Sequence, residues 1–238
     1  MKVLVVGLKR RSDRQARLKR WIPQHWCLRF LSDEGLDWDG ATIEDWPGLP
    51  HLFNWKIVSE NSWWNRPLRA GEVGCSMSHI EAWKIVAKDS KGFHLILEDD
   101  VNGLEGFDSK ISEFLEWLSA NAPNWDLAYV GREPLTFSEQ ILTEKISKPD
   151  YSYGSYGYLL SGIGAQKLLA YNLQSDLIPV DEFLPATFSS HPRLDVRTRF
   201  KPSLEAFALI PPTIDHPNHQ DSDTEGSEEL EREVATGA

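Results

Sequence analysis

Unbroken runs of apolar or weakly polar residues recur along the chain, with helical patterns between them. Such runs are typical of strands that a sheet buries on both faces. They predict strands at residues 2–6, 93–97, 127–130, 156–160 and 206–210. Residues 194–200 instead alternate between apolar and polar, and this pattern predicts an edge or antiparallel strand.

Apolar residues three and four positions apart predict helices between several of these strands. Ser12 and Gln15 form a capping-box pattern, so a helix is expected to begin at Ser12. Further helices are expected from residue 73 or 76 to 88, over 108–120, and from about 165 to 172. Strands that alternate with helices predict an α/β fold with a mainly parallel sheet, which binds ligands at the carboxyl ends of its strands.

Two segments lack a regular period. Residues 32–70 are rich in Gly, Pro, Asp and Trp, and seven of the ten tryptophans lie between positions 21 and 64. Irregular structure with aromatic packing or an aromatic-lined cleft is expected there. Residues 151–157 (YSYGSYG) read as a loop of small residues and tyrosines, which either lets a substrate approach the backbone or forms a turn.

Composition and charge narrow the class of protein. The 238 residues, 41% of them hydrophobic, suffice for one sizeable domain, expected over residues 1–220. The net charge of −11 is uneven: residues 221–238 carry −6 and predict a flexible acidic tail, whereas residues 1–31 carry +8. A basic face on an acidic protein argues against general nucleic-acid binding but suits one small anionic ligand.

The remaining compositional signals concern location. Two cysteines are too few for a disulfide framework, which favours a reducing compartment. No apolar run approaches the about 20 residues of a membrane span, and the N-terminal run reads as a strand rather than a signal peptide. A cytoplasmic protein without a transmembrane segment is therefore expected, with peripheral membrane contact left open.

Three carboxylates, Glu98, Asp99 and Asp100, directly follow the predicted strand at 93–97. Residues i and i+2 of an extended segment point to the same side, so Glu98 and Asp100 can converge while Asp99 turns away or binds a ribose. Like charges this close repel unless a cation lies among them, and oxygen ligands suit Mg²⁺ or Mn²⁺. The alternative is a solvated acidic turn.

A basic loop with Arg10, Arg11 and Arg14 follows the first strand and leads into a helix N-terminus. That geometry offers backbone N–H groups and positive charge to an anion, although the glycines of the known phosphate loops are missing. A solvated basic helix face is the alternative. The helix that follows residue 70 carries Cys75 and His79, which could form a nucleophile pair, although a buried cysteine is commoner than a reactive one.

Two later segments could complete a site. Asp181 and Glu182 are enclosed by apolar residues and prolines, which raises a carboxyl pKa and suits a general base. They could equally be helix N-terminal acids after Pro179. His216 and His219 follow the last strand, and either could complete an oxygen-rich metal site or be a loop histidine without that role.

Taken in order, six motifs resemble glycosyltransferase family 25, which includes bacterial lipooligosaccharide galactosyltransferases and procollagen galactosyltransferases. The resemblance covers residues 2–224. It is carried by LKRRSDR (8–14), GEVGCSMSH (71–79) with Trp83, LEDDV (97–101), YGSYGYLLS (153–161) with Gly164-Ala165, PVDEFL (179–184) and SDT (222–224).

The resemblance implies a GT-A-like, Rossmann-type mixed sheet, a UDP-hexose donor, a glycan or glycolipid acceptor, and a divalent metal, Mn²⁺ or Mg²⁺. It also implies inversion at the anomeric carbon. The implied metal residues are Glu98, Asp100, His216 and His219, and Asp181 or Glu182 would be the base. The implied nucleotide-sugar contacts are Arg10, Arg11, Arg14, Glu72, Ser78, His79, Asp99, Gly154, Tyr156 and Gly157.

Two other functions stay open. The tryptophan-rich segment would also suit an inactive carbohydrate or nucleotide-sugar binding module, because indole faces pack on sugar rings. The carboxylates and histidines would also permit a metal-dependent phosphoester hydrolase.

Overall fold

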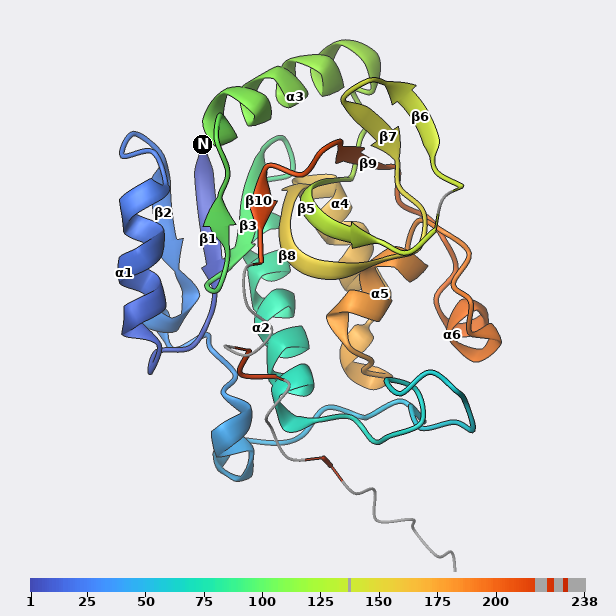
Figure 1. The fold of residues 1–238 in the computed structure, drawn as a ribbon. Coiled ribbons are helices and arrows are strands. Elements are labelled where there is room, and N and C mark those ends of the chain that lie inside the picture. Colours follow the sequence, from blue (N-terminus) through green and yellow to red (C-terminus); the bar gives the residue numbers. More distant parts are fainter. Residues whose placement is uncertain (137, 217–221, 225–228, 231–238) are drawn as a thin grey trace, which may run out of the picture.

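Strands and helices alternate along the chain and assemble into a mixed eight-stranded sheet (Figure 1). The computed structural model describes residues 1–136, 138–216, 222–224 and 229–230. The strand order of the sheet is β2-β1-β3-β8-β5-β9-β7-β6. Its strands are β1 (Lys2–Val6), β2 (Cys27–Phe30), β3 (Phe93–Glu98), β5 (Leu127–Pro134), β6 (Gln140–Thr143), β7 (Ile146–Lys148), β8 (Ser152–Ser161) and β9 (Ala206–Leu209).

Parallel strand pairs lie on both sides of β8 in the sheet. Strand β1 pairs in parallel with β2 and β3, and β5 pairs in parallel with β9. Strand β8 runs antiparallel between β3 and β5, and the β6–β7 hairpin is added to β9. This mixed sheet with helices on both faces confirms the predicted GT-A-like, Rossmann-type α/β fold.

The helices form two layers. They are α1 (Ser12–Trp21), α2 (Ala70–Val86), α3 (Phe107–Asn121), α4 (Gly162–Ala170), α5 (Val180–Ala186) and α6 (Leu194–Arg199), with 3₁₀ turns η1 (Leu31–Glu34), η2 (Gly40–Asp45) and η3 (Leu173–Ser175). Alternate strand residues face opposite sides, which gives two cores. Val3 and Leu95 belong to the core with α1 and α3, whereas Leu4 and Ile96 belong to the core with α2, α4 and α5.

A short two-stranded sheet lies beside the main one. Strand β4 (Asn102–Gly103) pairs antiparallel with β10 (Ile214–Asp215), so that Asp215 faces Asn102. The pairing fixes the chain that follows β10 beside the chain that follows β3. It therefore brings residue 216 next to the acidic triad, although more than 100 residues separate them in sequence.

Three local predictions were wrong. Residues 194–199 form helix α6 rather than a strand, because the buried residues Val196 and Phe200 are four apart, whereas Leu194 is 67% exposed. Residues 152–157 belong to β8 rather than to a loop. Helix α1 begins at Ser12 as expected, but the predicted capping box is wrong, because the N-cap is Arg11, whose side chain makes no capping hydrogen bond.

Helix α2 begins earlier than the sequence suggested. The backbone N–H of Arg69 donates to Glu72 Oε2 at 2.8 Å, which satisfies one of the free donors at the helix start. The first turn thus begins at Ala70, and its small residues allow the segment 37–40 to pack closely against the helix. Of the helices in the described residues, none combines the length and the apolar character that crossing a bilayer requires.

Substitution of Gly74 by alanine is expected to destabilise the fold. A Cβ at this position would lie 2.0 Å from the backbone oxygen of Trp38, so that backbone rather than the end of a flexible side chain would have to shift. The overpacking cost of about 1–3 kcal/mol exceeds the gain of about 1 kcal/mol that alanine brings to a helix. Urea unfolding should show a lower midpoint for Gly74→Ala. Gly48→Ala is the matched control, because a Cβ there meets no atom within 4 Å; an unchanged midpoint for Gly74→Ala would contradict the packing argument.

Candidate functional site

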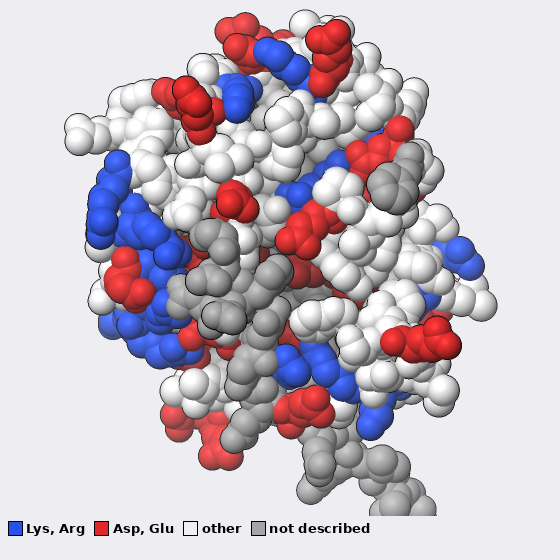
Figure 2. All heavy atoms as spheres, in the orientation of Figure 1, with Lys and Arg blue, Asp and Glu red and all other residues white. Residues whose placement is uncertain are grey.

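A cavity of about 510 Å³ lies at the carboxyl ends of β1 and β3. Its wall is completed by the first turns of α2 and α5, the middle of β8, and residues 216 and 222–224. This volume falls in the range typical of small-molecule sites, and the position is the one that the α/β pattern predicted. Lys and Arg side chains gather over α1 at the left of the face shown in Figure 2, and acidic side chains are visible near its centre.

All three residues of the acidic triad line the cavity, but they have different partners; β3 ends at Glu98, and Asp99 and Asp100 lie in the turn that follows. Glu98 lines the cavity, and its Oε1 accepts a hydrogen bond of 2.6 Å from Ser155 Oγ. Asp99 turns toward the first strand, where it accepts from the Leu8 backbone N–H at 3.1 Å and from Arg14 at 2.8 Å. Burial raises the pKa of Asp99 to about 6, against the opposing effect of Arg14. Gly7 is required here, because a Cβ would lie 2.1 Å from the Asp99 carboxylate.

Asp100 faces His216 across the cavity wall. His216 Nε2 lies 3.2 Å from Asp100 Oδ2, and the hydrogen bond raises the pKa of His216 to about 9. Burial acts to raise the pKa of Asp100, but this hydrogen bond and the charges of His216 and Arg14 outweigh it and lower the pKa. The other oxygen, Oδ1, is buried and has no hydrogen-bond partner within the described part of the chain. His219, the second predicted histidine, lies outside the described residues.

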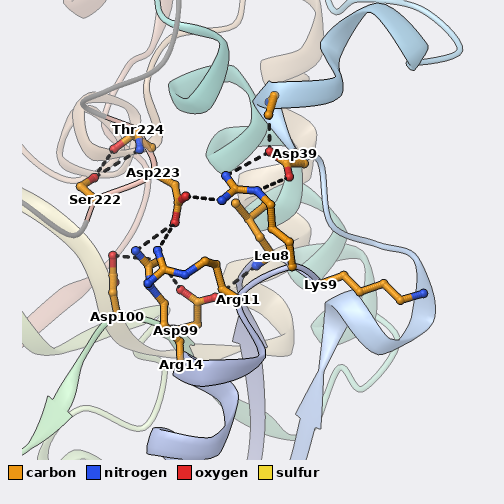
Figure 3. A network of polar contacts seen from close by, with 12 residues as sticks. Leu8, Lys9, Arg11, Arg14, Asp39, Asp99, Asp100, Ser222, Asp223 and Thr224 are labelled. Atoms are coloured by element: carbon orange, nitrogen blue, oxygen red, sulfur yellow. Dashed lines mark hydrogen bonds and ion pairs between the residues drawn. The ribbon is translucent and has the colours of Figure 1, made fainter.

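The three predicted arginines meet one carboxylate. Arg10, Arg11 and Arg14 contact Asp223 at 2.6, 2.8 and 2.9 Å (Figure 3). Arg10 also pairs with Asp39 at 2.6 Å, and Arg14 is buried between Asp223 and the acidic triad. Of the three, Arg14 lines the cavity. The basic loop thus holds an anionic group, supplied in this structure by the described part of the acidic tail.

Asp181 and Glu182 lie side by side at the start of α5 but differ in their surroundings. Asp181 Oδ1 accepts from the Ser155 backbone N–H at 2.8 Å. Its burial and the nearby charge of Glu98 raise its pKa to about 6. Both residues stand in the first turn of the helix, so the interpretation as N-terminal acids is also confirmed.

Glu182 is fixed by a complete set of donors. It is 3% exposed, and its oxygens accept from Trp64 Nε1 at 2.8 Å and from Tyr151 Oη at 2.6 Å. His191 Nε2 lies 2.8 Å from the same carboxylate. These partners tie the tryptophan-rich segment to α5. Both carboxylates line the cavity, but Asp181 has fewer hydrogen-bond partners than Glu182.

The remaining predicted contacts are spread over the wall and the layer behind it. Glu72, Ser78, Gly154 and Tyr156 line the cavity. His79 is fully buried behind the wall, and Gly157 packs against Ile214. Burial and the charge of Glu98 raise the pKa of the Cys75 thiol well above its usual value, which argues against a thiolate nucleophile beside His79.

Three residues of the site were not singled out from the sequence. Ser155 bonds Glu98 through its hydroxyl and Asp181 through its backbone, so it spaces the two carboxylates. Asp39 and Asp223 hold the basic loop. The motif SDT pointed to the neighbourhood of Asp223 but not to its arginine partners, since ion pairs across more than 200 residues leave no local pattern.

Comparison with known proteins gives one consistent family. The family model of glycosyltransferase family 25 (LPS biosynthesis protein) matches residues 1–184. The probable inactive glycosyltransferase 25 family member 3 of Rattus norvegicus is 32% identical, with 94% of this chain and 39% of the relative covered. Procollagen galactosyltransferase 2 of Homo sapiens is 30% identical, covering 91% of this chain and 35% of the relative. Procollagen galactosyltransferase 1-A of Xenopus laevis is 31% identical, covering 93% and 36%.

The chain spans between 35% and 39% of the length of these three relatives. The family model nevertheless matches more than half of this chain, and its range includes β1, the basic loop, the acidic triad and Asp181. With this match and the GT-A-like fold together, the chain belongs to glycosyltransferase family 25.

Proposed function

We propose that the protein is a metal-dependent glycosyltransferase that moves a hexose, galactose or glucose, from a UDP-sugar to a hydroxyl of a glycan or glycolipid acceptor, with inversion. The observation that carries the proposal is the meeting of three kinds of group in one cavity. Glu98 and Asp100 offer oxygen ligands, Arg14 offers positive charge, and Asp181 offers a carboxylate with a raised pKa.

The residues present fit a hard divalent cation. A buried carboxylate oxygen without a donor is costly, and Asp100 Oδ1 is such an atom among the described residues. Glu98 lies two positions earlier at the same strand end, and His216 already contacts Asp100. Asp100 and Glu98 would hold Mg²⁺ or Mn²⁺, and His216, whose pKa is about 9, would join them after releasing its proton. When bound, the ion would neutralise charge on the leaving diphosphate.

The chain's own groups supply the rest of the reaction. Asp181 accepts the proton of the acceptor hydroxyl, and the acceptor oxygen bonds to the anomeric carbon as the bond from that carbon to the phosphate oxygen breaks and UDP leaves. This single displacement inverts the configuration at the anomeric carbon. The hydrogen bond from Ser155 holds Asp181 in place for this step. The arginines of the basic loop bind the donor phosphates. Their ion pairs with the Asp223 carboxylate support this role.

The cavity wall supports a sugar as the acceptor. Trp38, Trp55, Trp63 and Tyr153 contribute to it. Aromatic faces pack on the apolar faces of sugar rings, and their polar edges can hydrogen-bond to hydroxyls. The tryptophan-rich segment that forms this wall is anchored to α5 by the bond from Trp64 to Glu182.

Thermal unfolding with a panel of nucleotides and nucleotide sugars tests the donor class. UDP-galactose or UDP-glucose with Mn²⁺ should raise the melting temperature, and each alone should raise it less, because a ligand that binds the native state stabilises it. A ligand at 100 times its dissociation constant adds about 2.7 kcal/mol. A matched panel of ADP- and GDP-sugars is the control.

Transfer to a mixed glycan acceptor separates the enzyme from the two other functions. Sugar release that rises with acceptor supports the proposal. Metal-dependent binding without turnover would indicate a binding module, a relevant outcome because one similar relative is named as probably inactive. Release to water at the same rate with and without acceptor would indicate a hydrolase.

A further inference from the structure

A thiol, an imidazole and a carboxylate meet at the inner wall of the cavity. Cys75 and His79 lie one turn apart on the same face of α2, and Glu98 ends β3 opposite them. One ligand atom from each of the three residues lies within 4.8 Å of the others. Ligands of a single tetrahedral Zn²⁺ are about 3.3–3.8 Å apart when the bonds are about 2.0–2.3 Å long. Small side-chain adjustments therefore suffice to bring the three atoms onto one ion.

From this geometry we propose that Cys75, His79 and Glu98 form a site for a thiophilic divalent cation, with Zn²⁺ as its natural class. Sulfur, nitrogen and oxygen together are a zinc ligand set, and three protein ligands leave a fourth position for water. Glu98 and Asp100, by contrast, offer only oxygen and suit a harder ion. The cavity thus presents two donor sets of different chemistry that share Glu98.

The hydrogen bonds that hold His79 are arranged as around a metal-binding histidine. His79 is fully buried, and its Nδ1 lies 2.8 Å from Tyr158 Oη. Tyr158 in turn accepts a hydrogen bond of 2.8 Å from Trp83 Nε1. This chain fixes the imidazole ring and leaves Nε2 directed at Glu98, 3.3 Å away. A partner on the far nitrogen that sets ring orientation is the usual arrangement around metal-binding histidines.

The charges around Cys75 favour the binding of a cation. The carboxylates of Glu98, Asp181, Asp100 and Asp99 act electrostatically on Cys75. The same carboxylates create a negative potential that attracts a divalent ion, and coordination then deprotonates the thiol outright. The proton leaves to solvent and the Cys75 sulfur binds the ion as thiolate, so uptake of one Zn²⁺ should release protons.

Metal titration of the ligand-free protein tests the site. Zn²⁺ affinity is measured by competition with a chromophoric chelator, and Co²⁺ is used as a spectroscopic probe of thiolate ligation. Wild type should bind one tight Zn²⁺ and show a thiolate-to-cobalt charge-transfer band. Cys75→Ser should lose the band and weaken Zn²⁺ by more than about 100-fold, since even residues that only support a ligand contribute about 10–100-fold.

Cys27→Ser is the matched control, because Cys27 is the other cysteine and is exposed on β2. It should bind both ions as wild type does. Cys75→Ala, checked for folding by circular dichroism, should behave as Cys75→Ser. Retention of the band and of the affinity in both Cys75 variants would overturn the proposal, and so would their loss in Cys27→Ser.

Because Glu98 belongs to both donor sets, Zn²⁺ should compete with the hard cation of the transfer reaction. That consequence rests on the proposed function. The binding titration does not, because it uses neither nucleotide nor acceptor. Failure of the transferase proposal would therefore leave the zinc result standing, and failure of the titration would leave the transferase proposal standing.

Discussion

Asp181→Asn is expected to abolish transfer and to stabilise the protein at the same time. As the proposed base, Asp181 should contribute about 10²–10⁴-fold to turnover, and an amide cannot accept the proton. The isosteric Asn can still accept the Ser155 hydrogen bond through its oxygen. The substitution removes a negative charge that destabilises the folded state, because burial and Glu98 raise the pKa of Asp181 from 3.8 to about 6.

The sign of the stability change follows from this pKa. In the folded state Asp181 binds its proton more tightly than in the unfolded state, so its ionisation destabilises the fold above pH 6 and ceases to matter below about pH 4. The gain of Asp181→Asn should be largest at pH 8 and should disappear as the pH falls toward 4. After allowance for partial exposure it amounts to about 1–2 kcal/mol, or about 2–6 °C in melting temperature.

Thermal melts in EDTA from pH 4 to 8, beside a transfer assay, check both parts. Glu182→Gln, at the neighbouring position, serves as the comparison for the stability change. In this variant an amide nitrogen would replace the carboxylate oxygen that Tyr151 and His191 contact. The free energy of unfolding should therefore fall by about 1–3 kcal/mol. If Asp181→Asn kept full turnover, Asp181 would not be the base; if it lowered stability at pH 8, the electrostatic argument would be wrong.

Asp100→Asn should remove metal-dependent transfer while the fold survives. The substitution takes one anionic ligand and leaves the shape of the side chain. Loss of charge neutralisation on the leaving group is worth several kcal/mol, so turnover with metal should fall by about 10³-fold. The fold should tolerate the change, because Arg14 retains Asp99 at 2.8 Å and Asp223 at 2.9 Å.

Two measurements distinguish the loss of a metal ligand in Asp100→Asn from a general loss of activity or stability. Titration of Mn²⁺ in the transfer assay should give no activation of Asp100→Asn, and the metal-dependent rise in melting temperature with UDP-sugar should vanish. Glu116→Gln, on the exposed side of α3, removes an equal charge far from the cavity and should behave as wild type. Normal Mn²⁺ activation of Asp100→Asn would exclude Asp100 as a metal ligand.

Several features could be predicted from local sequence because their physical cause is local. A continuous apolar run such as Val3–Val6 must be buried on both faces, which identifies β1 and, with its helices, the α/β class. The position of Glu98, Asp99 and Asp100 directly after a buried strand indicated that carboxylates line a cavity at this edge of the sheet. The enclosure of Asp181 by apolar residues anticipated its raised pKa.

Other local patterns misled because packing overrode them. Alternation at 194–200 suggested a strand, yet burial of Val196 and Phe200 on one helix face decided for α6. The glycines of residues 151–157 suggested a loop, yet the neighbours β3 and β5 supply the hydrogen bonds that make it part of β8. Strand pairing is a long-range property, so a short segment with mixed preferences takes the structure that its neighbours stabilise.

The sequence by itself determined the residue types of the site, the order of the strands that deliver them, and the charge of the loop at the end of β1. Only the tertiary structure decided which of these residues meet. The β4–β10 pairing places His216 on Asp100, Ser155 spaces Glu98 from Asp181, and Asp223 joins three arginines. These contacts depend on sheet register and on chain segments far apart in sequence, and no local pattern encodes them.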